Sequence, residues 1–154
     1  TYAVALDKNL EFNINTGGQL SLDDLLNSEQ SSITGPDKLS GFTSGSISGD
    51  ESWYFRGQLN YKKKLSNKLT LTPYVYGATG VSYTLTPTAT ENRATAARSI
   101  GLGLKVDSID NYFFDKNISA KVEYSKNWAT GVLEDVSDVR LNKQHLLVNL
   151  AMNF

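Results

Sequence analysis

The sequence predicts an all-β protein, an antiparallel transmembrane β-barrel of which this chain forms a part, and three observations predict it. Apolar and polar residues alternate with a period of two along most of the 154 residues, which is the pattern of strands with one apolar face. Short connections between these runs alternate with long ones, and aromatic residues stand near the ends of the runs. Both features are typical of bacterial outer-membrane barrels.

The chain opens on the tail of a strand, residues 2–6, followed by a turn signal, "DKN", at residues 7–9. Leu10, Phe12 and Ile14 then alternate with polar residues, so the next strand begins directly after this turn. The long polar stretch that follows, at about residues 20–51, is predicted to be a loop.

Residues 52–62, "SWYFRGQLNYK", form the clearest predicted strand. Its apolar positions share one face: Trp53, Phe55, Leu59 and Tyr61. The intervening polar positions, which include Arg56 and Gln58, share the other face, because successive side chains of a strand point to opposite sides.

Four further runs alternate in the same way, at residues 69–83, 99–107, 118–128 and 145–154. The positions between their apolar residues include Tyr74, Tyr76 and Ala78 in the first run, Lys105 in the second, and Lys121 and Glu123 in the third. We therefore expect about six strands plus the tail of another, and no helix.

A soluble β-sandwich would alternate too, but loop lengths favour a membrane barrel. Turns near 7–9 and 64–68 are short, whereas connections near 20–51, 85–94 and 130–141 are long. The connection at 108–116 is longer than a tight turn and fits this rule less well. Outer-membrane barrels have short periplasmic turns and longer outside loops, and they need no long apolar helix.

Aromatic residues fall where the two membrane interfaces would lie. With the long loops outside, Trp53, Tyr83 and Trp128 stand at the outer ends of their strands, and Tyr61 and Phe154 at the inner ends. Aromatic girdles at both interfaces are expected of such barrels. Bacterial barrels have about eight strands or more, so the chain is expected to be a C-terminal part of a larger barrel.

Composition excludes several classes of function. The formal net charge is −1, with 15 basic and 16 acidic residues, so no overall field favours a nucleic acid as partner. Cysteine is absent and histidine occurs once, which excludes disulfides, thiolate metal sites and a Cys nucleophile. Asp23, Asp24 and Glu29 lie in a polar loop, and His145 begins the last strand. We predict no catalytic residue, metal or cofactor, and no enzymatic activity.

The stretch from residue 18 to 63 resembles the outer-membrane transporters of two-partner secretion, the TpsB family, whose superfamily includes the BamA insertase. In that family a Leu-Leu-x-x-Glu-Gln segment precedes Gly-Pro-x-x-Val-Arg-Gly-Tyr/Phe, and a Ser-Gly-Asp-x-Gly-Trp-Tyr run opens the next strand. The matching residues are Gln19, Leu25, Leu26, Glu29, Gln30, Gly35, Pro36, Leu39, Gly41, Phe42, Ser48, Gly49, Asp50, Trp53 and Tyr54.

The resemblance implies a barrel of about 16 strands, with periplasmic POTRA domains and N-terminal strands that this chain does not include. It implies a pore in the outer membrane of a Gram-negative bacterium that exports one large adhesin, haemolysin or contact-dependent toxin without ATP. The implied partners are an exoprotein with an N-terminal two-partner secretion domain, the barrel-assembly machinery and outer-membrane lipid. An insertase of the BamA type and a soluble β-sandwich binding module are the alternatives.

The resemblance also implies that the loop at about 20–51 folds into the barrel lumen, with its tip against the wall. The tip residues are Gly35, Pro36, Leu39, Ser40, Gly41 and Phe42, and the expected wall contacts are Tyr74, Tyr76 and Ala78. The family's tip Arg corresponds to Ser40, and its acidic partner falls at Tyr76–Ala78, so both charges are missing. Because losing both members of a buried pair can be nearly neutral, we expect docking through packing and neutral hydrogen bonds.

Five residues are candidates for lining the lumen, where they would keep the channel wet and contact the passing chain: Arg56, Gln58, Lys105, Lys121 and Glu123. The alternative is that they only solvate the interior of the barrel. Phe154 is a candidate anchor at the inner interface and, by the resemblance, the signal that the assembly machinery reads.

Overall fold

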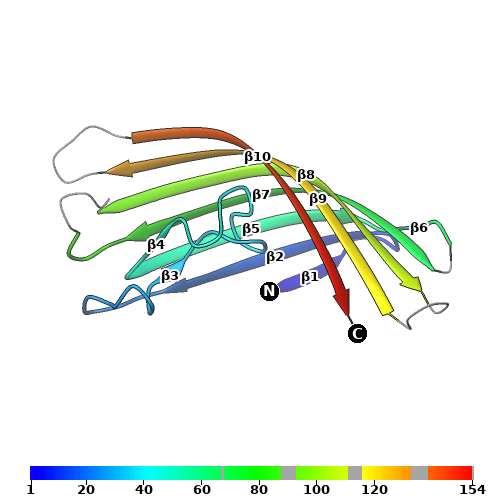
Figure 1. Ribbon diagram of the computed structural model, residues 1–154, viewed down its shortest axis with the longest axis horizontal. Helices are drawn as coiled ribbons and strands as arrows, with labels where there is room; N and C mark the ends of the chain where they lie inside the picture. Colours follow the sequence, from blue (N-terminus) through cyan, green and yellow to red (C-terminus); the bar gives the residue numbers. More distant parts are fainter. Residues whose placement is uncertain (67, 88–92, 111–115, 133–138, 154) are drawn as a thin grey trace.

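The computed structural model describes residues 1–154 except 67, 88–92, 111–115, 133–138 and 154. The described residues form one curved antiparallel sheet (Figure 1) in the order β1-β2-β5-β7-β8-β9-β10, with β6 also paired to β7. Its strands are β1 (Tyr2–Ala5), β2 (Leu10–Gln19), β5 (Glu51–Tyr61), β6 (Lys63–Lys64), β7 (Leu69–Tyr83), β8 (Ala94–Asp110), β9 (Lys116–Val132) and β10 (Val139–Asn153). A second, two-stranded sheet pairs β3 (Ser31–Ser32) with β4 (Ser48–Gly49).

The predicted antiparallel all-β fold is confirmed, although β3, β4 and β6 were not predicted and β10 begins at Val139, six residues before the predicted run. β1 matches the predicted strand tail, and the turn after it is closed by bonds from the N–H groups of Leu6 and Asp7 to the carbonyl oxygen of Leu10. β8 and β9 are longer than predicted, since residues 94–98 pair with residues 128–132. The alternation of apolar and polar residues is the only sign of a strand that the sequence offers, and the pairing of β8 with β9 continues beyond the residues that alternate clearly. Within the described residues no helix is long and apolar enough to span a membrane.

The sheet has two chemically different faces. The face that residues 20–50 cover is called the inner face, and the opposite face is called the outer face. On β7, Tyr74, Tyr76 and Ala78 are buried on the inner face, whereas Val75 is exposed on the outer face. Trp53, Tyr61, Tyr83 and Trp128 are likewise exposed. Phe154 lies outside the described residues.

Residues 20–50, which connect β2 to β5, form what we call the docked segment. β2 and β5 pair directly, from Leu10 opposite Tyr61 to Gln19 opposite Ser52, so the whole segment is inserted at one end of this pair. In Figure 1 the segment, drawn in blue and then cyan, turns back in its cyan part across the sheet near β5 and β7. This places the family-like motif on the inner face.

Candidate functional site: a segment docked on the inner face

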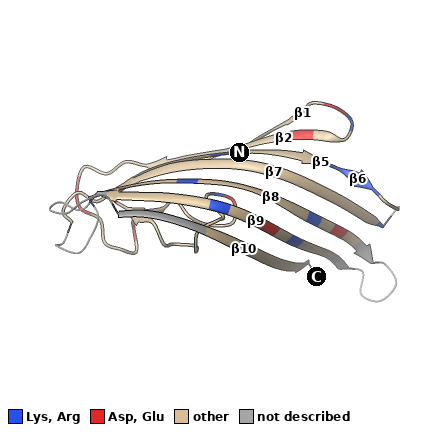
Figure 2. Ribbon diagram, turned by 90° about the horizontal axis from the view of Figure 1, so that it is seen from above, with Lys and Arg blue, Asp and Glu red and all other residues tan. Residues whose placement is uncertain are grey.

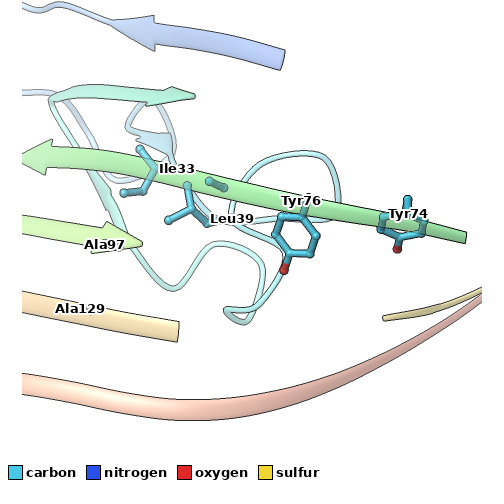
Figure 3. Close-up of a cluster of buried hydrophobic side chains, with 7 residues drawn as sticks. Ile33, Leu39, Tyr74, Tyr76, Ala97 and Ala129 are labelled. Atoms are coloured by element: carbon cyan, nitrogen blue, oxygen red, sulfur yellow. The ribbon is translucent and has the colours of Figure 1, made fainter. Parts of the chain in front are cut away.

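An apolar cluster joins the docked segment to the sheet. Ile33 and Leu39 of the segment are 0% exposed, and Figure 3 shows them beside the strand that carries Tyr74 and Tyr76. The sheet side of the cluster consists of Tyr74, Tyr76, Ala78, Ala97 and Ala129, and Phe42, Ile47 and Tyr54 pack around it. Complete burial of an Ile or Leu side chain contributes about 1.5–3 kcal/mol, so the cluster is a substantial part of the docking energy.

Small side chains on the sheet make room for this cluster. Ala78, Ala97 and Ala129 stand on β7, β8 and β9, and all three are buried. A larger residue at any of these positions would occupy the space that Ile33 and Leu39 fill, and overpacking a close-packed contact costs about 1–3 kcal/mol.

Ser40, at the tip of the segment, lies between two opposite charges of the sheet. Nη1 of Arg56, on β5, donates a hydrogen bond to the Ser40 hydroxyl over 2.5 Å, and that hydroxyl donates to Oε1 of Glu123, on β9. The guanidinium and the carboxylate also pair directly, with Nη2 3.3 Å from Oε2. The serine therefore completes a buried, charge-assisted network.

The rest of the network holds these two charges in place. Glu123 Oε2 accepts from the Tyr74 hydroxyl at 2.7 Å and lies 3.2 Å from Nζ of Lys121. The Arg56 guanidinium lies 3.7 Å from the centroid of the Tyr76 ring and also donates to Gln58 Oε1 at 2.8 Å. Buried charges require this degree of pairing, because an uncompensated one is costly.

A second polar contact holds Gly41. Nδ2 of Asn127, on β9, donates to the Gly41 carbonyl oxygen over 2.5 Å, and Oδ1 of Asn127 accepts from the Ser99 hydroxyl at 2.7 Å. Ser99 in turn is hydrogen-bonded to the Tyr76 hydroxyl at 3.0 Å. A Cβ on residue 41 would overlap the Asn127 amide, so any other residue at this position would displace that amide.

The structure brings together most, but not all, of the candidate tip and wall residues. Four tip residues contact the sheet: Leu39, Ser40, Gly41 and Phe42. The three expected wall residues, Tyr74, Tyr76 and Ala78, belong to the cluster that they meet. Gly35 and Pro36 instead form the turn before the tip, in which Lys38 N–H donates to the Gly35 carbonyl oxygen. Pro36 is exposed.

Two expectations about this site are corrected. The contacts of Ser40 are not neutral: the sheet supplies a cation from Arg56 and an anion from Glu123, in place of an Arg at the tip. Arg56 and Glu123 are also 3% and 1% exposed, because the docked segment covers them, so they do not line open solvent. Lys105 remains outside the network and pairs with Asp107 at 3.0 Å.

Sequence reasoning missed the roles of Ile33 and Asn127. The alternation places Asn127 on the same face as Glu123, which was the available signal, but many polar positions share that face. Nothing local distinguishes the one that meets Gly41, 86 residues away. Among the described residues no three His, Cys, Asp or Glu side chains gather closely enough to hold a metal ion.

Asp50 ties two parts of the docked segment to the connection that follows β7. Its Oδ1 accepts from Leu25 N–H at 2.9 Å and from the Gln30 side chain at 3.2 Å, and its Oδ2 accepts from Leu85 N–H at 2.8 Å. The hydrogen bond from Leu85, followed by those from Leu25 and Gln30, lowers the pKa of Asp50 against the opposing effect of burial. Hydrogen bonds to the charged form favour that form.

Asp50→Asn is expected to destabilise the protein by about 1–3 kcal/mol near pH 6, because an amide leaves part of the N–H set unsatisfied. Since the folded-state pKa of Asp50 is depressed, its contribution is complete above the unfolded-state pKa of about 3.9. It is lost as the pH falls through the lower folded-state value. The difference between the two proteins should therefore shrink below about pH 4.

Thermal unfolding followed by tryptophan fluorescence between pH 3 and 6 measures this difference. Asp23→Asn, at an exposed position of the same segment, is the matched control and should unfold like the wild type. A constant difference between Asp50→Asn and wild type over the whole range would contradict the titration of Asp50.

Comparison with known proteins gives one family. The model of the family described as haemolysin secretion/activation protein ShlB/FhaC/HecB matches residues 1–106. These residues contain the docked segment, Arg56 and the strands as far as most of β8. Neither the comparison with curated proteins nor that with solved structures gives a match.

Proposed function

This chain belongs to the ShlB/FhaC/HecB family of haemolysin secretion/activation proteins, the outer-membrane transporters of two-partner secretion, and we propose that it forms part of a pore that exports one large exoprotein without ATP. The cargo is an adhesin, a haemolysin or a contact-dependent toxin, recognised through an N-terminal secretion domain. The pore lies in the outer membrane of a Gram-negative bacterium.

The docked segment is the observation that carries this proposal. It covers a polar inner face while exposed Val75, Leu102 and Leu150 stand on the outer face. A cavity of about 260 Å³ beside Arg56 is lined by polar side chains, including Asn13, Asn15 and Gln58. An apolar exterior with a polar interior is the arrangement of a membrane barrel with an aqueous lumen, and a segment on that interior can control passage.

The edges of the sheet support a larger barrel. Within the described residues β1 and β10 each pair on one side only. A lipid bilayer does not tolerate unpaired strand edges, since their N–H and C=O groups find no partner there. We propose that further strands close the barrel, and that Gln58, Lys105 and Lys121 face its lumen.

Export of a cognate exoprotein tests the proposed function. The gene that carries this chain is expressed with a large exoprotein encoded beside it, and the exoprotein is assayed in the medium and in the periplasm. Secretion that requires the transporter supports the proposal. An exoprotein that stays periplasmic, although the transporter is present in the outer membrane in heat-modifiable form, contradicts it.

Phe154 provides a separate prediction about assembly. We propose that Phe154 is read by the barrel-assembly machinery, so removal of Phe154 is expected to lower the amount of heat-modifiable protein in the outer membrane several-fold. Phe154→Trp keeps an aromatic residue at this position and should retain the wild-type amount. Equal amounts in all three proteins would contradict this role.

A further inference from the structure

Two basic residues stand on the outer face of the sheet, where the surrounding positions are uncharged. Arg98 on β8 and Lys126 on β9 are both exposed. The other outward positions of these strands, over residues 94–108 and 118–130, are Ala, Ile, Leu, Val, Tyr, Trp, Ser and Thr. In Figure 2 β7 carries no charged position, whereas β8 and β9 carry both basic and acidic ones. A cation on a lipid-facing surface is costly unless it lies near the interface.

The register places these two cations around one aromatic side chain. Arg98 pairs directly with Trp128, and Lys126 pairs with Ile100, so Arg98 and Lys126 are diagonal neighbours on one face, with Cα atoms about 7–8 Å apart. Nζ of Lys126 lies 5.4 Å from the Trp128 ring centroid.

The pair lies at the border of the exposed apolar surface. On the side toward the connection between β8 and β9, Ile100, Leu102, Val122 and Tyr124 are all exposed. On the other side the strands lead to the connections that follow β7 and β9. Tryptophan and tyrosine favour such borders between apolar and polar surroundings, so Arg98 and Lys126 stand at the depth at which lipid headgroups meet acyl chains.

We propose that Arg98, Lys126 and Trp128 form a binding surface for the phosphate group of an outer-leaflet lipid, and this rests on the proposed outer-membrane location. The Arg98 guanidinium can donate hydrogen bonds to two phosphate oxygens, and the Lys126 ammonium adds a second positive charge. The acyl chains of the same lipid then cover Ile100, Leu102 and Tyr124. A phosphorylated amphiphile matches both the charge and the apolar surface, whereas free phosphate matches only the charge.

A lipid titration of the full-length transporter, purified in a neutral detergent, tests this surface. Native mass spectrometry counts molecules of bisphosphorylated lipid A retained by the wild type, by Arg98→Gln/Lys126→Gln, and by Lys63→Gln/Lys64→Gln. The last variant removes the same charge from exposed positions at the other end of the sheet. Removing two basic contacts to an anionic lipid is expected to weaken binding about 30-fold. The control should differ from wild type less than about twofold.

The source of the phosphate is tested in the same preparations. Dephosphorylated lipid should bind the wild type as weakly as lipid A binds Arg98→Gln/Lys126→Gln, and inorganic phosphate should not compete with lipid A. Unchanged binding to Arg98→Gln/Lys126→Gln, an equal loss in the control, or competition by inorganic phosphate would each overturn the proposal.

Heat-modifiable migration and export of the exoprotein, measured for the same variants, separate this inference from the proposed function. Variants that are folded and secrete normally, but bind lipid A like the wild type, refute the lipid surface alone. A wild type that is absent from the outer membrane refutes both.

Discussion

Replacing Glu123 with Gln is expected to release the docked segment from the inner face. The carboxylate is the shared counter-charge of Arg56, at 3.3 Å, and of Lys121, at 3.2 Å, and it accepts the hydroxyls of Ser40 and Tyr74. Removing one partner of a buried pair costs about 3–5 kcal/mol, because the remaining charge stays buried without compensation. In this site the cost can be relieved by undocking the segment, which admits water to Arg56.

Trypsin cleavage after Lys38 measures this release. In the docked state the Lys38 ammonium donates to the Ser32 carbonyl oxygen at 2.5 Å and lies 5.1 Å from the Tyr54 ring centroid, so cleavage requires the segment to open. A change of 3–5 kcal/mol corresponds to about 100-fold or faster cleavage. Glu11→Gln is the matched control: Glu11 pairs with the exposed Lys62 at 2.6 Å and is itself partly exposed, and an ion pair in such a position contributes about 1 kcal/mol at most.

A double variant distinguishes charge compensation from simple loss of contacts. Arg56→Met combined with Glu123→Leu removes both charges, and such replacements in buried pairs are often nearly neutral. The double variant should therefore be cleaved more slowly than Glu123→Gln. Cleavage of Glu123→Gln at the wild-type rate would show that the buried charges do not hold the segment.

Gly41→Ala is expected to displace the tip of the docked segment from the sheet, in this case because of steric overlap. The added methyl group would collide with the amide of Asn127, which is itself held by Ser99 and by Ser125. Overpacking of this kind costs about 1–3 kcal/mol, and the displaced Asn127 would also lose its hydrogen bond to the Gly41 carbonyl oxygen. Faster cleavage after Lys38, by about 10-fold or more, is the expected result.

Gly77→Ala is the matched control for this change, because a Cβ at Gly77 meets no atom within 4 Å. It should leave the cleavage rate unchanged. Asn127→Ala opens space at residue 41, so Gly41→Ala should have less effect in that background than in the wild type. Additive effects of the two substitutions would argue against a direct collision.

The resemblance of residues 18–63 to the TpsB family predicted that the docked segment contacts the sheet. It did not predict which charged residues the tip would meet. The motif directed attention to Tyr76–Ala78 as the place of the missing acidic partner. The carboxylate that Ser40 meets is on β9, two strands further along the sheet from β7. The cation comes from Arg56, which the alternation had placed on the polar face with no sign that it would be buried.

The main strands, their antiparallel order and their two faces follow from the sequence, because a period of two is a property of consecutive residues and strands that follow one another in the chain usually pair. The network of Ser40, Arg56 and Glu123 does not. These residues are 16 to 83 positions apart, and they meet only when the strand register is complete and the segment has settled over it. Position in the chain states which face a side chain takes, whereas tertiary packing determines which partner it finds there.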